Sequence, residues 1–243
     1  MKLELYNPSI FKDAFDTIGR IIDECKINFN TEGMSINALD KSHITFITLN
    51  FKYSLFDEYD CPNPESVIVD TKQLMDILKR CKNDDIIKLY TDDNNLILTF
   101  KGDAEKTFSI RLIDNEYDTP QPPRLEYPVT LNLPSQIINE SLGDAKVYAE
   151  NLKFEVDQDY LHIRTTTGTF GDVHSKYIHG ENVTSYVKSG FSINMLLDIF
   201  KAAKLSKTCM LSLGNDMPLT VRFNLISDDG YLEFLLAPRL EEP

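Results

Sequence analysis

The sequence predicts an α+β fold, dominated by strands in antiparallel hairpins and built from two similar halves. Three observations support it: an internal repeat, two helix-like hydrophobic periods in each half, and alternating hydrophobic patterns over most of the remaining chain. Of the 243 residues, 42% are hydrophobic and 26% charged, which excludes a disordered or fibrous protein. The first twenty residues lack a signal-peptide pattern and no stretch is apolar enough for a membrane helix, so we expect a cytoplasmic protein.

The internal repeat has a constant offset of 122 residues. It places LMDILK at 74–79 over LLDIFK at 196–201, with four identical pairs in six positions. Without a gap, the same offset places residues 86–100 over 208–222, and both of these continuations have the pattern of paired strands. The repeat therefore predicts one architecture of about 120 residues used twice.

Each half is predicted to contain two helices, because apolar residues recur there at helical spacing. Pro8 and Pro134 each precede one of these periods, and proline is well placed to open a helix. The second helix of the second half is expected within 192–207. The periods are formed by Phe11, Phe15, Ile18 and Ile22; by Leu74, Ile77, Leu78 and Cys81; by Ile138, Leu142 and Ala145; and by Ile193, Leu196, Leu197 and Phe200.

The segment 115–128, with four prolines, separates the two halves. It has no helical period and its prolines suit neither a helix nor a central strand, so we interpret it as a connector between domains at 1–114 and 129–243. The P-x-x-P pattern at Pro120 and Pro123 is also found in polyproline ligands of SH3-type domains. That pattern is common and weakly specific, so we favour the connector.

The sequence offers no candidate for catalysis, because it contains no P-loop, dinucleotide-binding, nucleophile-elbow or H-E-x-x-H motif. TTTGTFGD at 165–172 is better explained as a hairpin turn than as a phosphate loop. No metal or cofactor is expected. The histidines at 162, 174 and 179 lack metal-ligand spacing, and the cysteines show neither a C-x-x-C nor a zinc pattern, so we expect reduced, mostly buried thiols at Cys25, Cys61, Cys81 and Cys209.

Positive charge is concentrated on one predicted helix of each half, although the net charge of the chain is −13. The two segments, 72–82 and 192–207, hold seven basic and two acidic side chains. Lysine is common on any solvated helix face, but the same bias on two equivalent helices is less readily explained that way. An acidic surface with a basic strip on each repeat suits a protein that encloses a polyanion without reading its sequence.

Four stretches of the sequence carry a resemblance to a known family. They are IIDECKINFNTEGMSINALDKSHITFITL at 21–49, TFSIRLID at 107–114, GNDMPLTVRF at 214–223 and YLEFLLAPRLEE at 231–242. The G-M-S-I-N-A-L-D-K-S-H core and the L-A-P-R-L-E ending are the most specific of these. Over essentially its full length the chain resembles the proliferating cell nuclear antigen (PCNA) sliding clamps, especially those of archaea.

The resemblance implies the DNA clamp fold: two duplicated domains, each with two helices and antiparallel sheets, and three subunits in a closed ring. The helices would line the central hole. The contact between subunits would join edge strands, here Thr107–Ile113 of one copy and about Asn182–Lys188 of the next. Such a head-to-tail contact closes when its rotation generates three copies.

The resemblance also implies which basic residues face the DNA. One departure is in the helix that opens at Ser135, where related clamps tend to carry Lys or Arg and this chain has Asn139 and Gly143. We therefore expect this helix to hold DNA more weakly. The candidate DNA-binding residues are Lys12, Arg20, Lys72, Lys79, Arg80, Lys82, Lys146, Lys201, Lys204 and Lys207.

A partner pocket is implied in the same way, in which replication proteins insert a short helical turn with an aliphatic residue and two aromatic residues. Leu235 stands where many relatives have an aromatic residue, so the shape of the pocket is expected to differ. Phe46 and Leu236 are explained equally well as ordinary core residues. The candidate partner-binding residues are Leu39, His43, Ile44, Phe46, Leu125, Tyr127, Leu235, Leu236, Ala237 and Pro238.

The sequence and the resemblance together predict a non-enzymatic, cofactor-free DNA sliding clamp that forms a homotrimer. It would encircle double-stranded DNA and keep a DNA polymerase, flap endonuclease, ligase and similar proteins on it, after a clamp loader opens the ring. The alternative is a subunit of a hetero-trimeric or checkpoint-type clamp that acts mainly as a protein-interaction scaffold. An enzyme on a duplicated α+β fold is the least supported reading.

Overall fold

A computed structural model describes residues 1–114, 116–165, 171–225 and 228–240 of the chain. The chain forms two compact units. Unit 1 comprises Met1–Pro122 and Leu225–Leu232, and unit 2 comprises Pro123–Asn224 and Glu233–Pro243. No helix in the described ranges has the length and apolarity needed to cross a membrane.

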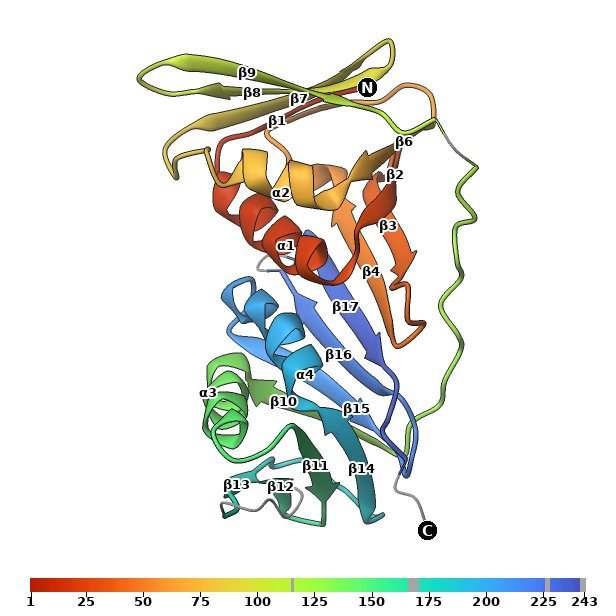
Figure 1. The fold of residues 1–243 in the computed structure, drawn as a ribbon, viewed down its shortest axis with the longest axis vertical. Coiled ribbons are helices and arrows are strands. Elements are labelled where there is room, and N and C mark those ends of the chain that lie inside the picture. The colour runs from red at the N-terminus through yellow and green to blue at the C-terminus, as the bar shows by residue number, and fades with distance from the viewer. Residues whose placement is uncertain (115, 166–170, 226–227, 241–243) are drawn as a thin grey trace. The chain divides into compact units, whose positions relative to one another are not determined.

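In its described residues, unit 1 has two α-helices and ten strands, the last of which it shares with unit 2 (Figure 1). In chain order its elements are β1 (Lys2–Leu5), α1 (Pro8–Ile21), β2 (Glu24–Asn30), β3 (Gly33–Leu39), β4 (Thr45–Lys52), the 3₁₀ turn η1 (Tyr53–Leu55), β5 (Glu58–Asp60), β6 (Glu65–Asp70), α2 (Thr71–Leu78), β7 (Ile86–Asp92), β8 (Asn95–Lys101), β9 (Glu105–Arg111) and the start of β17 (Gly230–Leu236).

The strands of unit 1 pair antiparallel in two groups. One is a five-stranded sheet in the order β5-β1-β7-β8-β9, and the other includes the run β4-β3-β2-β6. The helices α1 and α2 pack against each other, and α2 also contacts β2, β6 and β9 (Figure 1). As a result, one face of the helix pair covers strands and the other stays open to solvent.

The helices of unit 1 begin where the sequence supplies caps. The Asn7 side chain accepts a hydrogen bond from the main-chain nitrogen of Ser9, and Pro8 occupies the first helical position of α1. At the start of α2, the Asp70 carboxylate accepts one from the nitrogen of Gln73 at 2.7 Å. The predicted apolar faces are buried, including Phe11, Phe15, Ile18, Leu74 and Leu78.

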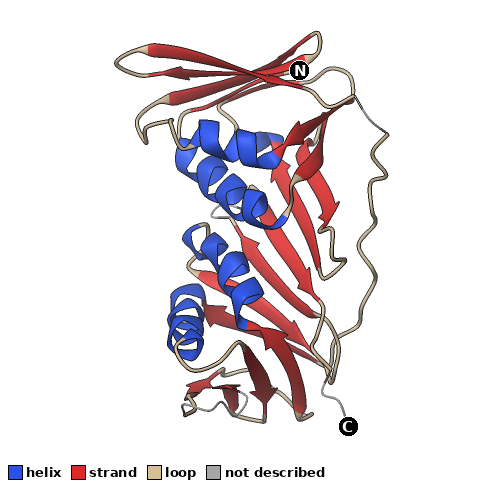
Figure 2. Ribbon diagram, viewed as in Figure 1, coloured by secondary structure: helices blue, strands red, loops and turns tan. Residues whose placement is uncertain are grey.

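Unit 2 repeats the two-helix plan with its own strands (Figure 2). Its strands form a four-stranded sheet in the order β13-β12-β11-β14 and the antiparallel run β10-β15-β16. In chain order its elements are β10 (Val129–Pro134), α3 (Ser135–Lys146), β11 (Asn151–Val156), β12 (Tyr160–Thr165), β13 (His174–Ile178), β14 (Val187–Ser192), α4 (Ile193–Ile199), the 3₁₀ helix η2 (Phe200–Lys204), β15 (Thr208–Leu213), β16 (Leu219–Asn224) and the end of β17.

The structure confirms the predicted α+β fold with two helices in each half. The offset of 122 residues found in the sequence relates α2 to α4, β7 to β15 and β8 to β16, within one or two residues at most boundaries. Residues 166–170 of the predicted hairpin turn 165–172 lie outside the described residues.

One helix is shorter than the sequence predicted. A helix was expected within 192–207, but α4 ends at Ile199 and continues as 3₁₀ helix to Lys204. Ile199, Ala202 and Leu205 are all buried, and they recur every three residues. That is the period of a 3₁₀ helix, so the tighter turn places all three on the core side.

A short segment late in the chain belongs to unit 1. The main-chain nitrogen of Lys52 donates to the carbonyl of Asp229, and the Ser54 hydroxyl donates to the Asp229 carboxylate at 2.7 Å. Gly230 has φ +147°, and a Cβ there would lie only 2.1 Å from the carbonyl oxygen of Asn50. Only glycine allows this close approach of the two strands.

Candidate functional site

The candidate DNA-binding residues of unit 1 gather on α1, α2 and the turn that follows α2. Lys72 lies in the first turn of α2, whereas Lys79, Arg80 and Lys82 come after its end at Leu78. These four side chains and that of Arg20 are exposed. Because the buried faces of both helices point into unit 1, the basic residues lie on its solvent side, as the periodicity predicted.

Lys12 differs from the other basic residues in that its amine is held by the protein. Its Nζ donates to the carbonyl oxygen of Cys81 at 2.6 Å and to Oδ1 of Asn83 at 3.0 Å. The side chain is half-buried and ties α1 to the turn that carries Lys79 and Lys82. Lys12 therefore positions this basic turn in addition to contributing its own charge.

Several of the exposed cations also contact a carboxylate. Arg20 lies 3.4 Å from Asp16, and Lys79 lies 3.3 Å from Asp76 and 4.0 Å from Asp16. A hydrogen bond from Lys82 to Asp103 at 2.9 Å raises the pKa of that amine. Exposed pairs of this kind contribute little stability, so these side chains can exchange one oxygen partner for another at small cost.

In unit 2 the candidate residues lie on α3, on η2 and just before β15. Lys201 and Lys204 belong to η2, Lys146 ends α3, and Lys207 precedes β15. All four side chains are exposed. The carbonyl oxygen of Lys207 accepts a hydrogen bond from the nitrogen of Ser135, which joins the start of α3 to this basic segment.

The solvent face of α3 carries more acidic than basic side chains. Glu140 and Asp144 are exposed on it, against the single cation of Lys146. Asn139 is half-buried. Gly143 is exposed, and a Cβ at this position would meet nothing within 4 Å.

The partner-binding candidates of unit 1 lie around a tight turn between β3 and β4. Asp40 holds this turn: its carboxylate accepts hydrogen bonds from the main-chain nitrogens of Ser42, Ile44 and Thr45 at 3.1, 2.7 and 2.6 Å. His43 has φ +57° and is exposed, and Ile44 is 40% exposed. Asp40 is a site residue that the sequence reasoning missed, although its position before Lys-Ser-His matches a side chain that caps its own turn.

Burial separates these candidates into two groups. In unit 1, Leu39 is half-buried and Phe46 is 6% exposed. In unit 2, Leu236 is 1% exposed. The burial of Phe46 and Leu236 agrees with the core reading that the sequence had left open.

The remaining candidates of unit 2 are partly accessible. Tyr127 donates to or accepts from the Thr220 hydroxyl at 2.8 Å, and burial of its ring raises the pKa of its phenol. This bond fixes the residue at the end of the connector. The half-buried side chains are those of Leu125, Tyr127, Leu235, Ala237 and Pro238.

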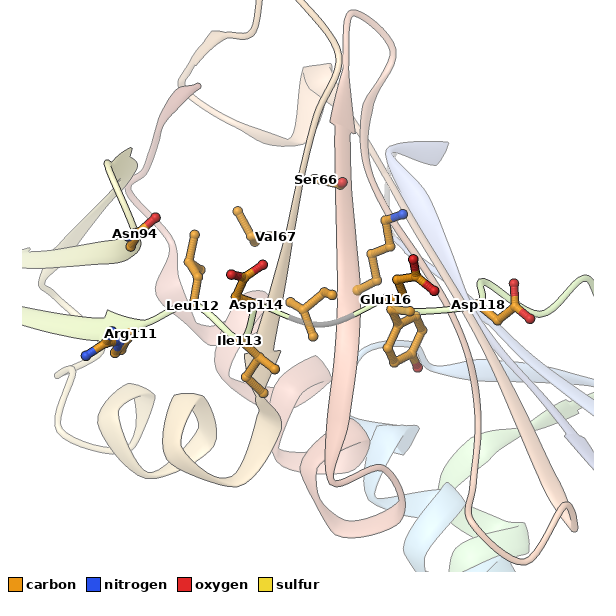
Figure 3. A pocket seen from close by; sticks show the side chains of 12 residues that line it. Ser66, Val67, Asn94, Arg111, Leu112, Ile113, Asp114, Glu116 and Asp118 are labelled. Carbon is orange, nitrogen blue, oxygen red and sulfur yellow. The ribbon is translucent and has the colours of Figure 1, made fainter.

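A groove of about 840 Å³ lies in unit 1, where the chain leaves β9 (Figure 3). It is lined by Ser66, Val67 and Ile68 of β6 and by the chain from Arg111 onward. The acidic residues Asp114, Glu116 and Asp118, labelled in Figure 3, also line this groove. Lys26 is a further lining residue.

The edge of β6 faces this groove with main-chain groups. Ile68 accepts a hydrogen bond from the nitrogen of Ile113 at 2.9 Å, so the main-chain groups of Ile68 point away from β2. Residues two apart in a strand point the same way, which directs the N–H and C=O of Ser66 to the same side. The edge can therefore accept a short extended segment.

The prediction of one of the two contact strands between subunits is wrong. Most of Asn182–Lys188 is not a strand, because β14 begins only at Val187, and Val183 turns inward to 8% exposure. The outer edge of β14 is also occupied, since Arg239 donates to the carbonyl of Gly190 at 2.8 Å. The open edge of this sheet is β13, whereas the predicted Thr107–Ile113 overlaps β9, at the end of the five-stranded sheet.

The thiols are placed as the sequence predicted. All four cysteines are reduced and buried. Burial raises the pKa of Cys25 and Cys209 to about 12 and that of Cys81 to about 11, so their reactive thiolate forms are scarce at neutral pH.

Comparisons with known proteins agree along the whole chain. Residues 1–120 match the model of the proliferating cell nuclear antigen N-terminal domain, and residues 146–239 match that of the C-terminal domain. Proteins described as DNA polymerase sliding clamps from Methanobrevibacter smithii and Methanothermobacter thermautotrophicus are 45% and 44% identical over 240 residues, covering 99% of this chain and 98% of each relative.

Solved structures give the same result. A chain of the PCNA2–PCNA3 complex from Sulfolobus tokodaii is similar with a TM-score of 0.91 and 25% sequence identity, covering 99% of this chain and 100% of that one. The family models and the close relatives thus span both units and include the basic helices and the turn held by Asp40. The chain belongs to the proliferating cell nuclear antigen family.

Proposed function

We propose that the protein is a DNA sliding clamp, which encircles duplex DNA and serves as a processivity factor for DNA polymerase. The observation that carries this proposal is the placement of exposed basic residues on or next to equivalent helices of both units, in a chain whose net charge is −13. Membership of a family whose relatives are described as DNA polymerase sliding clamps supports it.

The mechanism is enclosure rather than tight contact. Lysine binds phosphate as a mobile point charge, and phosphates repeat evenly along the duplex, so contacts can be exchanged as the ring moves. The ion pairs of Lys79 and Arg20 with nearby carboxylates favour such exchange, because each cation has an alternative oxygen partner. The acidic remainder of the surface discourages adhesion to DNA elsewhere.

Ring closure by three copies would use the two open strand edges. We infer that β9 of one copy pairs with β13 of the next, since β9 and β13 each end a sheet. On β13, Ile178 is 75% exposed, which is an unusual position for an isoleucine unless another surface covers it. Pairing these edges would also remove two sites of uncontrolled strand addition.

Partner proteins would dock beside the turn held by Asp40. Ile44 offers an exposed apolar contact there, and His43 a polar one. An extended flank of the partner can add to the edge of β6 in the neighbouring groove, where Asp114, Glu116 and Asp118 favour basic side chains. Polymerase, clamp loader, flap endonuclease and ligase are the partner classes that the resemblance implies.

The clamp itself would act without catalysis, because its role is to tether enzymes that do the chemistry. A hetero-trimeric arrangement is the second candidate, favoured by one observation: the similar solved structure is a complex of two different PCNA chains. In that case the same DNA face and turn would be present, but three copies of this chain would not close a ring.

The DNA-facing role is tested by charge reversal in both units. Lys79→Glu combined with Lys201→Glu should weaken clamp retention on circular DNA at moderate salt. It should also make the fall of log K with log salt less steep, by about one unit of slope or more. Lys188→Glu is the control, since Lys188 is an exposed lysine of β14 on the side of that strand opposite its buried residues. Unchanged retention in the double variant would refute the basic lining.

The docking role is tested at an exposed position, because Phe46 and Leu236 are buried and their truncation would disturb folding. Ile44→Ala should weaken binding of a partner peptide by about 1 kcal/mol or more, or at least fivefold. The measurement is a fluorescence polarisation titration, with Lys41→Ala in the same turn as the control. Wild-type affinity in a folded Ile44→Ala protein would place the docking site elsewhere.

A further inference from the structure

Two histidines on neighbouring strands of unit 2 lie next to each other on one face of the sheet. Their strands, β12 and β13, pair antiparallel, with His162 opposite Lys176 and Arg164 opposite His174. The histidines are therefore diagonal neighbours on one face of the sheet, close enough for their rings to meet. The ring centroids are 5.2 Å apart, and the planes are inclined by 25°.

A carboxylate fixes the orientation of the inner histidine. Nε2 of His162 lies 2.8 Å from Oδ2 of Asp157, and its Nδ1 lies 2.9 Å from Nε2 of His174. This carboxylate accepts a hydrogen bond from the ring. A neutral His162 therefore carries its hydrogen on Nε2 and directs the lone pair of Nδ1 toward His174.

This arrangement is the one in which a histidine serves as a metal ligand. A ligating imidazole usually donates its other N–H to a carboxylate, which fixes the tautomer and makes the free nitrogen more basic. His162 is 8% exposed, so its ring is held in place, whereas His174 is exposed and can adjust. One nitrogen is thus preorganised and the second is mobile.

The chemistry of the two ring nitrogens limits the choice of ion. Their separation of 2.9 Å is that of a hydrogen bond, so the exposed His174 ring turns for both nitrogens to reach one ion. Imidazole suits divalent first-row metals, among which Cu²⁺ binds most strongly. Cu²⁺ and Ni²⁺ are the ions that favour tetragonal sites with nitrogen donors.

We propose that His162 and His174 form a surface binding site for Cu²⁺ or Ni²⁺, with Asp157 as the positioning residue for His162. Within the described ranges, no three or more His, Cys, Asp or Glu are grouped so that they could hold a metal ion, so water completes the coordination. On binding, His174 changes tautomer: the proton on Nε2 leaves to solvent and another proton joins Nδ1. The exchange releases no net proton.

The neighbouring charges limit the affinity without blocking the site. Arg164 is paired with Glu155 at 3.1 Å, and Lys176 lies over the ring of Tyr160 at 3.4 Å from its centroid. Both cations are thus engaged with other groups beside the histidines. With two protein ligands we expect an affinity well below that of a closed structural site, but one that distinguishes this pair from single histidines.

The site would have a mechanical effect on the sheet. An ion held by both histidines cross-links the end strand β13 to β12 in addition to their main-chain bonds. Binding to the folded state alone also raises its stability by mass action. Both ligands come from one chain and neither is a DNA-binding candidate, so the site can be tested in the absence of DNA.

The test is a Cu²⁺ titration of the full chain followed by electron paramagnetic resonance and calorimetry. The wild type should bind one Cu²⁺ per chain with nitrogen couplings from two imidazoles, and its melting temperature should rise. His174→Gln should lose the two-nitrogen signal and the thermal shift. Asp157→Asn should bind at least tenfold more weakly.

The matched control is His43→Gln, which removes an exposed histidine from unit 1 and should keep the wild-type signal. His174 is exposed, so its substitution should leave the fold intact, as circular dichroism would verify. The proposal is overturned if the wild type shows no two-nitrogen signal, or if His174→Gln binds Cu²⁺ as tightly as the wild type does.

Discussion

Glu4 is a buried carboxylate whose charge is stabilised by neighbouring lysines. This residue of β1 is 4% exposed, and its carboxylate accepts a hydrogen bond from Lys88 of β7. Lys2 adds a further cation at 3.6 Å. The hydrogen bond from Lys88 is the main cause that lowers the pKa of Glu4, and it outweighs the opposing effect of burial.

Removing this partner should destabilise unit 1 in a pH-dependent way. The folded state lowers the pKa of Glu4, so its contribution is present above the unfolded pKa of about 4.3 and is lost as pH falls below it. We expect Lys88→Met to reduce the free energy of unfolding by about 1–3 kcal/mol at pH 7, and the difference to narrow below pH 4. Urea unfolding at both pH values measures it, with Lys101→Met as control; a difference independent of pH would contradict this account.

For single residues, the sequence predicts local properties and misses contacts between distant parts of the chain. The sequence placed all ten basic candidates on or next to helices because charge and period are local properties. It missed the hydrogen bonds of Lys12 to Cys81 and Asn83, which join residues about 70 positions apart. It also dismissed His162 and His174, whose spacing of 12 becomes a contact only once β12 and β13 pair. Strand register was the missing information.

Among the elements, α3 is the helix whose role can be changed most directly. Gly143 is exposed on it, with open space around its Cβ position, so a side chain can be added without a clash. Glycine within a helix costs about 0.5–1 kcal/mol relative to alanine. Both its stability and its charge can therefore be raised at this one position.

We predict that Gly143→Lys stabilises unit 2 by about 0.5 kcal/mol or more and strengthens retention on DNA at moderate salt. Gly143→Ala is the matched control, because it supplies the helix propensity without the charge. Thermal unfolding and retention on circular DNA separate the two effects. If both variants hold DNA equally, α3 does not face the duplex.

The elements also show how far a repeat can be extrapolated. The 122-residue offset predicted the paired strands β7 and β8 from β15 and β16, because both copies keep the same alternation. It did not predict that α4 would end at Ile199, since a 3₁₀ period resembles a helical one over five residues. Nor did it locate the open edge at β13, which depends on the C-terminal segment bonding to Gly190.

At the scale of the whole molecule, the question is how many copies assemble. A closed homotrimer predicts a solution mass of about 83 kDa, three times that of the 27.8 kDa chain. We expect light scattering over a dilution series to give this mass. Replacing the exposed Ile178 of β13 by Asp should lower it by placing a charge on the proposed contact.

The control for this measurement is Tyr53→Asp, an exposed aromatic residue in unit 1 outside both strand edges. A persistent monomer of the wild-type chain at all concentrations would favour the hetero-trimeric arrangement. A trimer that survives Ile178→Asp would place the contact on another surface.

The path of the chain between the units has a consequence for how the molecule comes apart. The chain passes from one unit to the other more than once. After the connector has led into unit 2, Leu225–Leu232 belongs to unit 1 again, and Glu233 is back in unit 2. A protease that cut once near Pro122 would produce two fragments of similar size on a denaturing gel, yet the C-terminal one would still hold a segment that belongs to unit 1. The halves of this duplicated protein are therefore interlaced, and neither can be excised whole as one continuous stretch of sequence.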